Sequence, residues 1–238
     1  MADGSTTAGA EEAAAGAPAG TDTDAADPAA PGRQPVLAQD SAPPGLVPLS
    51  DAEQTELKGS CAKLVTWAQQ RAGKAPTRAA ATQKLLEAMS GEVKLDGVDV
   101  PRCRDLLTRE LRVYLAKTKE LEAITTLKRL MLAMSTAVQE RGKLCPSAPP
   151  VPAKLGQVKS APYASQASDW QAEGWKCLRY QGNPRQRFQY AVKSDPAAQS
   201  FEIVARGFPH GGGEPTELFL SGKVVNGQVE LHSDVYRR

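Results

Sequence analysis

The longest regular pattern of apolar residues lies in the middle of the chain. Nine apolar positions recur there at steps of three, four or seven, which is the spacing of one face of a helix. Asp99, with Pro101 close behind, marks a helix start, and Gly142 marks its end. We therefore predict one amphipathic helix over residues 99–142, with an apolar stripe roughly 50 Å long. The stripe consists of Leu107, Leu111, Tyr114, Leu121, Ile124, Leu127, Met131, Met134 and Val138.

Shorter helical patterns precede this helix. Ser50 followed by Glu53 is a capping box, and apolar residues continue from there at roughly helical spacing up to Gly73. A second pattern opens with Pro76 and stops at Gly91. Residues 46–98 are thus predicted to form a small helical hairpin.

After the long helix the pattern changes. Residues 143–160 contain the proline-rich run "CPSAPPVPAK", which predicts an extended connector. Short runs rich in aromatic and β-branched residues then alternate with turn formers, and Asn226-Gly227 between two such runs is a strong hairpin signal. These runs are "GWKCLRY", "RFQYAVKS", "SFEIVARG", "TELFLSGKVV" and "QVELHSDV".

This order of patterns predicts an α+β fold. Successive strands without helical spacing between them favour an antiparallel sheet of about four strands over residues 161–238. Its first hairpin would run from Gly174 to Val192, with "QGNP" as the turn. One face of such a sheet needs a cover, and the long amphipathic helix is the obvious candidate.

Composition and charge add an N-terminal segment of a different kind. Residues 1–45 are rich in Ala, Gly, Pro, Thr and Asp and carry seven acidic side chains against the single base Arg33. Such a segment buries too little apolar surface to offset its ordering entropy, so we predict a disordered acidic tether. In the remainder, basic and acidic groups alternate, which gives no support to nucleic-acid binding. No apolar run is long enough to cross a membrane.

Candidate chemistry is sparse. The chain has two histidines, His210 and His232, and no GxSxG, HExxH or Walker motif, so we predict a non-enzymatic protein. The glycine-rich turn "FPHGGGEPTE" offers Glu214 and Glu217, too few oxygen ligands for a calcium site. We therefore predict neither a metal nor a cofactor.

The four cysteines form no CxxC pair, which leaves two disulfides or four buried thiols. Cys145 closes the long helix and Cys177 lies in the first predicted strand. If that strand packs on the helix end, a bridge between them would close a loop of about thirty residues and stabilise the fold by about 3–4 kcal/mol. Cys61 would then pair with Cys103 by elimination.

The second half of the chain resembles a known family. "KTKELEAITTLKRLMLAMSTAVQERG" followed by "LCPSAPPVP", "SDWQAEGWKCLRY" and "RFQYAVKSD" is similar to type IV pilins and pilin-like proteins, over roughly residues 112–235. In that family an N-terminal helix leads into an antiparallel sheet, and one sheet cysteine pairs with another just after the helix. The resemblance thus implies a Cys145–Cys177 disulfide. The matching helix positions are Lys117, Lys119, Glu122, Ala123, Thr126, Leu127 and Lys128.

Two features depart from the family. Pilins carry an apolar segment ahead of this region, whereas this chain has the charged "KLDGVDVPRCRDLLTRELRVYLA", which cannot span a membrane. Similar pilins often have an Asp-rich turn where this chain reads "GFPHGGGEP". A calcium site is therefore not carried over from the resemblance.

The resemblance implies a bacterial, extracytoplasmic structural or interaction protein with protein partners. It would be a pilus or secretion-system accessory or an envelope surface protein, tethered through an anchor upstream of residue 1. The alternative is a soluble module that binds a small ligand or glycan through the open sheet face or the 208–215 loop. Exposed aromatics beside a pocket favour that alternative, and buried aromatics packed on the helix favour the first. The candidate surface residues are Trp170, Tyr180, Phe208 and His210.

Overall fold

The long helix lies where the apolar spacing predicts it. In the computed structural model, α4 spans Val100–Arg141, and the Asp99 side chain caps it by accepting a hydrogen bond from the backbone N–H of Arg102. At the other end, Gly142 adopts the left-handed conformation with φ of 68°, which a residue without Cβ tolerates best. At 1.5 Å per residue, its 42 residues extend over roughly 63 Å.

The structure describes residues 34–35, 45–211, 213–232 and 234–237, all of which belong to one unit, Gly32–Arg238. The predicted acidic tether, residues 1–45, lies outside the described residues except for Gln34–Pro35 and Gly45. Gln34–Pro35 form a two-residue strand, β1.

The sheet is antiparallel, as predicted, and its main strands are consecutive in sequence. They are β5 (Phe188–Asp195), β6 (Ser200–Gly207), β7 (Thr216–Val225) and β8 (Gln228–Leu231). The predicted hairpin turn joins β7 to β8, and Asn226 and Gly227 both have positive φ there.

Short strands widen the sheet beyond the four that were predicted. β2 (Ala148–Val151) pairs with β5, β9 (Tyr236–Arg237) pairs with β7, and β1 pairs with β9. The order is β1-β9-β7-β6-β5-β2, with β8 also on β7. A separate ribbon consists of β3 (Tyr163–Ala164) and β4 (Arg185–Gln186).

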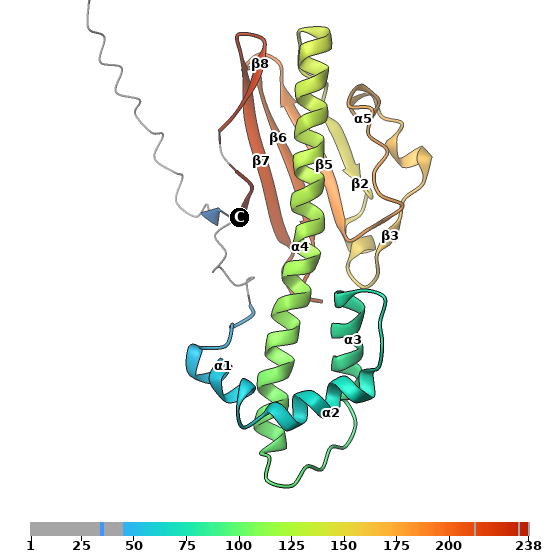
Figure 1. Cartoon of the computed structure of the whole chain (residues 1–238). Helices are drawn as coiled ribbons and strands as arrows, with labels where there is room; N and C mark the ends of the chain where they lie inside the picture. Colours follow the sequence, from blue (N-terminus) through green and yellow to red (C-terminus); the bar gives the residue numbers. More distant parts are fainter. Residues whose placement is uncertain (1–33, 36–44, 212, 233, 238) are drawn as a thin grey trace, which may run out of the picture. The chain divides into compact units, whose positions relative to one another are not determined.

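The C-terminal part of α4 covers one face of this sheet (Figure 1). Buried side chains on one side of the helix, among them Leu127, Leu130 and Met134, share a core with inward-facing residues of β6 and β7. Leu121, which the apolar stripe included, lies outside this core and is 56% exposed. Two steps of three residues separate Leu121 from Leu127 and place the two side chains about 120° apart around the helix, so Leu121 points toward solvent while Leu127 packs on the sheet.

The predicted first strand is wrong. Residues 173–177 form a short helix, α5 (Glu173–Cys177), preceded by the 3-10 turns η1 (Leu155–Val158) and η2 (Ala167–Trp170). A helical turn directs Gly174 onto the chain before β2, where an added Cβ would lie 2.5 Å from the Ser147 carbonyl oxygen. It also buries Trp175 and Leu178, three residues apart, on one inner side. The predicted hairpin through "QGNP" is therefore absent.

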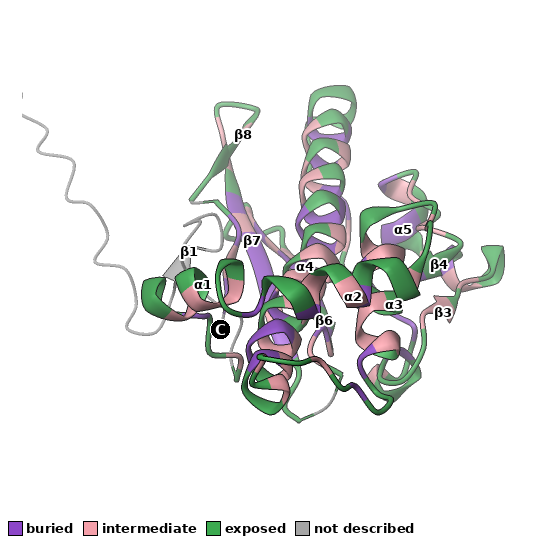
Figure 2. Cartoon of the chain, turned by 60° about the horizontal axis from the view of Figure 1, so that its bottom comes forward, coloured by how far each residue is buried: buried purple, intermediate pink, exposed green. Residues whose placement is uncertain are grey.

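The helices before α4 also differ in number. The first predicted helix divides into α1 (Asp51–Lys58) and α2 (Ala62–Ala72), with a break at Gly59, where φ is −98° and ψ −94°. The second is α3 (Arg78–Ala88). We call α1, α2 and α3 the helical cap, because they contact the N-terminal part of α4 (Figure 1). Figure 2 shows α1 and most of α2 and α3 as exposed or half-buried, whereas half of the residues of β7 are buried.

Candidate functional site

Both disulfides that the cysteine arrangement suggested are present. Cys145–Cys177 joins the chain just after α4 to the last residue of α5, and Cys61–Cys103 joins the start of α2 to the first turn of α4. Arg141 donates hydrogen bonds to the Sγ atom and the carbonyl oxygen of Cys177, at 2.8 and 3.3 Å. No cysteine remains free, which is typical of proteins in oxidising, extracytoplasmic compartments.

The aromatic residues proposed as a contact surface divide into two groups, and the first is not at the surface. Trp170 is 2% exposed, which corrects its assignment as a surface residue. Its ring packs edge-to-face on Trp175 and on half-buried Tyr180, with centroids 5.0 and 5.3 Å apart. The Trp175 indole also donates a hydrogen bond to the Pro149 carbonyl. These aromatics therefore build core between α4 and the connector rather than a binding face.

The second group, Phe208 and His210, lies in the turn between β6 and β7, which we call the 208–211 turn. Lys119 on α4 holds this turn by donating a 2.9 Å hydrogen bond to the Pro209 carbonyl. His210 lies 3.4 Å from the Thr216 hydroxyl and 3.9 Å from one carboxylate oxygen of Glu120. The turn is thus fixed against the middle of α4.

A buried ion pair lies directly behind the 208–211 turn. Glu120 on α4 accepts a 2.7 Å hydrogen bond from Arg237 on β9, and their side chains are 4% and 7% exposed. Burial raises the pKa of Glu120, although the charge of Arg237 opposes that change. Burial, then the charges of Arg237 and Lys119, lower the pKa of His210. The imidazole is therefore neutral at neutral pH, and Arg237 is the counter-charge of Glu120.

Lys119 also lines a hollow of about 330 Å³. We call it the basic pocket, because its lining includes Lys119, Lys159 and Arg187, together with the ring of Phe208. The other lining residues are small or apolar: Val158, Ser160, Ala161, Pro162 and Gly211.

The charges around the basic pocket are only partly compensated. Glu122 accepts hydrogen bonds from both the backbone N–H and the guanidinium of Arg187, at 2.7 and 3.2 Å. Lys159 lies over the Phe208 ring, 5.5 Å from its centroid. Burial, then the charge of Arg187, lower the pKa of Lys119. A group of cations facing one small hollow is suited to hold an anion.

Sequence reasoning identified the turn but not the cations. Phe208 and His210 belong to the 208–215 loop, named above as a candidate ligand-binding loop. Lys119, Lys159 and Arg187 come from three segments far apart in the chain, and only the fold brings them together. Lys119 matched the pilin pattern, but that pattern carries no information about a pocket.

The chain has further charged clusters. A hollow of about 610 Å³ beside the Cys145–Cys177 disulfide is lined by Arg141, Lys143 and Lys176, with Glu173 among them. Within the described ranges, no group of three His, Cys, Asp or Glu side chains could hold a metal ion. None of the helices described has the length and apolar composition needed to cross a bilayer.

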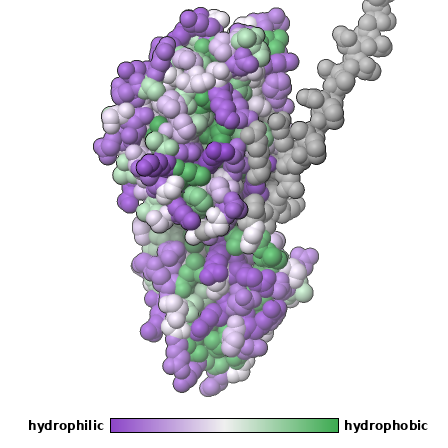
Figure 3. All heavy atoms as spheres, turned by 180° about the vertical axis from the view of Figure 1, so that it is seen from behind, coloured by the Kyte–Doolittle hydropathy of each residue, from purple (hydrophilic) through white to green (hydrophobic). Residues whose placement is uncertain are grey.

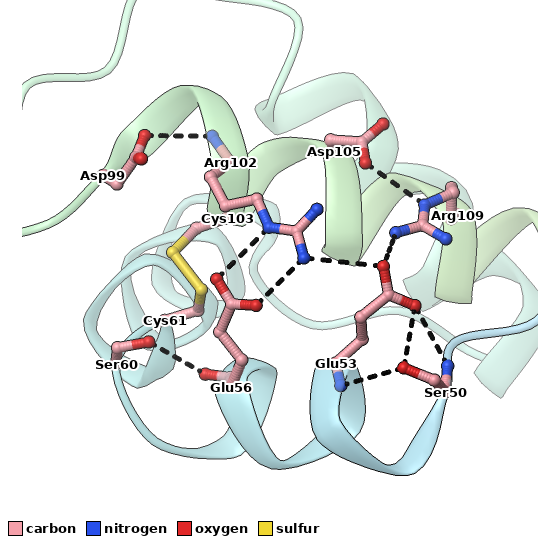
Figure 4. Close-up of polar contacts among 10 residues, drawn as sticks. All are labelled: Ser50, Glu53, Glu56, Ser60, Cys61, Asp99, Arg102, Cys103, Asp105 and Arg109. Atoms are coloured by element: carbon pink, nitrogen blue, oxygen red, sulfur yellow. Dashed lines mark hydrogen bonds and ion pairs between the residues drawn. A yellow bond between two sulfur atoms is a disulfide. The ribbon is translucent and has the colours of Figure 1, made fainter.

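A network of ion pairs fastens the helical cap to α4 (Figure 4). Glu53 on α1 accepts a 2.6 Å hydrogen bond from Arg109 and lies 3.5 Å from Arg102, which also pairs with Glu56. The same carboxylate accepts a hydrogen bond from the backbone N–H of Ser50 in the predicted capping box. The Arg109 hydrogen bond, followed by the Ser50 N–H, lowers the pKa of Glu53 to about 2.

Comparisons with known proteins give no further assignment. No protein-family model, no curated protein and no solved structure matches this chain.

Proposed function

We propose that the chain is a non-enzymatic, extracytoplasmic protein that works through contacts with other proteins and is built on the plan of a type IV pilin. A pilus or secretion-system accessory and an envelope surface protein both fit this description. The order and packing of the elements carry the proposal. The 42-residue helix α4 precedes the main strands, and its C-terminal part covers the antiparallel sheet that they form. A disulfide joins the chain just after that helix, at Cys145, to the end of α5, at Cys177, which precedes the main strands.

The main departure from pilins also has a structural counterpart. Where pilins carry an apolar membrane segment, the N-terminal part of α4 has apolar positions, such as Leu106 and Leu107, that the helical cap covers. The Cys61–Cys103 disulfide and the Glu53 network hold the cap there. On this proposal, the cap replaces the membrane segment and keeps that part of the helix in water.

A contact face is available on α4 itself. Leu121 and Leu132 are 56% and 60% exposed on the side of the helix away from the sheet. They stand eleven residues apart, about three helical turns, and so lie on one face. We place the protein contact on this face. The opposite side of the molecule is a weaker candidate, because Figure 3 shows it mostly hydrophilic with small apolar patches, outside the part that grey atoms cover.

Site-specific photo-crosslinking in cells of the source organism tests the proposal. A photoreactive residue at Leu132 is expected to give adducts with a pilus, secretion or envelope protein. The same residue at Gln83, an exposed position of α3, serves as the control and is expected to give none. Cell fractionation with thiol alkylation accompanies it. A cytosolic protein with four reduced thiols, or identical adducts from both positions, would reject the proposal.

A further inference from the structure

We propose that the basic pocket binds a small organic anion, namely a molecule with a single ring that carries a carboxylate or phosphate group. This inference goes beyond the protein contacts proposed above and does not depend on them. It rests on the shape of the pocket, the charges that line it and its apolar wall.

The walls of the basic pocket are held by independent contacts. The 208–211 turn is anchored through the Lys119 hydrogen bond to the Pro209 carbonyl. The wall at residues 158–162 leads directly into β3, and Arg187 directly follows β4. Pairing of Tyr163 with Gln186 in the β3–β4 ribbon joins these two walls. The hollow is therefore built into the fold and does not depend on a single loose loop.

Hydrogen-bond donors remain available at the pocket. An ammonium has three N–H groups, and Lys119 is bonded through one of them to Pro209. A guanidinium has five, and Arg187 uses Nη1 toward Glu122. Of the described residues that line the pocket, none carries a carboxylate. A bound oxyanion would therefore meet donors from α4, from the connector and from the residue between β4 and β5.

The local electrostatics favour a bound anion. Lys119 is half-buried and lies near a second cation, Arg187, and both conditions disfavour its charged form. Glu120 follows Lys119 in the sequence, but its carboxylate does not neutralise the charge of Lys119, because it is buried and paired with Arg237. An oxyanion in the pocket would supply the missing counter-charge where water has been partly displaced.

Size and apolar lining define the rest of the ligand. A volume of about 330 Å³ lies at the small end of ligand pockets, which fits a single ring better than a chain of several units. Phe208, Val158, Ala161 and Pro162 provide an apolar wall beside the cations. A bare ion would leave this wall without a contact.

Isothermal titration calorimetry of the full chain at low ionic strength tests the inference. The probes are glucuronate, glucose 6-phosphate, inorganic phosphate and glucose, which separate carboxylate, phosphate ester, free ion and neutral ring. We expect glucuronate or glucose 6-phosphate to bind with 1:1 stoichiometry, at least about tenfold tighter than glucose or inorganic phosphate. Lys159→Gln is expected to weaken that binding about tenfold by removing a charge-assisted contact.

Two further variants distinguish binding inside the pocket from nonspecific attraction of an anion to surface cations. Ala161→Trp fills the hollow from an exposed position without changing charge and is expected to abolish binding. Lys223→Gln removes an exposed cation from β7, outside the pocket lining, and is expected to leave binding unchanged. Circular dichroism confirms that each variant is folded. The inference is overturned if neither organic anion binds at about 10 mM, if phosphate alone binds equally well, or if Lys159→Gln and Ala161→Trp bind like the parent chain.

Discussion

At the scale of single residues, Gly182 shows how closely the aromatic core is packed. It has φ of +70°, and an added Cβ would overlap the Trp170 ring. Trp170 in turn contacts Trp175 and Tyr180, so the ring has little room to move. The aromatics of this segment therefore depend on a residue without a side chain.

We expect Gly182→Ala to lower the free energy of unfolding by roughly 3 kcal/mol, through the positive φ and the clash with Trp170. Gly97→Ala is the matched control, because Gly97 has a similar φ of +73° and nothing within 4 Å of its Cβ position. It is expected to cost about 1 kcal/mol. Urea unfolding followed by tryptophan fluorescence measures both free energies. Equal losses in the two variants would show that a clash with Trp170 does not contribute to the cost of Gly182→Ala.

At the scale of elements, regular patterns were predicted well and short ones poorly. α4 and β5 to β7 are long enough for their apolar patterns to specify them, the Asn226-Gly227 turn marks the hairpin of β7 with β8, and the capping box at Ser50 is present. "GWKCLRY" was misassigned because alternating bulky residues suit a strand and a helical turn alike. The contact of Gly174 with the Ser147 carbonyl is compatible with the helical turn, and it is a tertiary contact that no local pattern contains.

The candidate site was also predicted only in part, because a local sequence pattern does not show which distant segments come together in the fold. The 208–211 turn has a local signature, namely glycines beside Phe208 and His210. The basic pocket has none, since Lys119, Lys159 and Arg187 meet only after β3 pairs with β4 and α4 packs on the sheet. β9 was missed as well, because two residues are too few to show alternation.

The attachment of α1 to α4 is expected to depend on pH through Glu53. Its pKa in the folded protein is about 2, below the usual value of 4.5. The lowered pKa means that the ionised form stabilises the fold above about pH 4.5, and that this contribution is lost as pH falls toward 2. The stability difference between the parent chain and Glu53→Gln should therefore shrink over that range.

Urea titrations at several pH values, followed by far-ultraviolet circular dichroism, measure this difference. Glu110→Gln changes an exposed glutamate of α4 outside the network and provides the control. A gap between parent and Glu53→Gln that stays constant from pH 5 to pH 2 would contradict the role assigned to the Arg109 contact.

At the scale of the whole molecule, the Glu120–Arg237 pair joins segments 117 residues apart. It connects α4 to β9, which is otherwise held by short pairings with β7 and β1. Both side chains are nearly inaccessible to water, so removing one partner leaves the other charge buried without compensation.

We expect Arg237→Met to lower the free energy of unfolding by roughly 3–5 kcal/mol, because the Glu120 carboxylate is then buried alone. The double variant Glu120→Met with Arg237→Met should recover most of that loss, since no charge remains buried. Lys193→Gln, which breaks an exposed pair with Glu202, should cost less than about 1 kcal/mol. Chemical denaturation compares the three. The buried pair would lose its assigned role if Arg237→Met cost no more than Lys193→Gln.

The two disulfides also determine how the chain responds to tension. Each lies at one end of α4, and they close segments of 42 and 32 residues. A force applied between the chain ends passes through each sulfur bridge and bypasses the residues that it encloses. Those residues cannot lengthen while the bridges are intact, which withholds roughly 25 nm of contour length. The length to which this protein extends under force therefore depends on whether the two disulfides are oxidised or reduced. With both intact, the force between them is carried by α4.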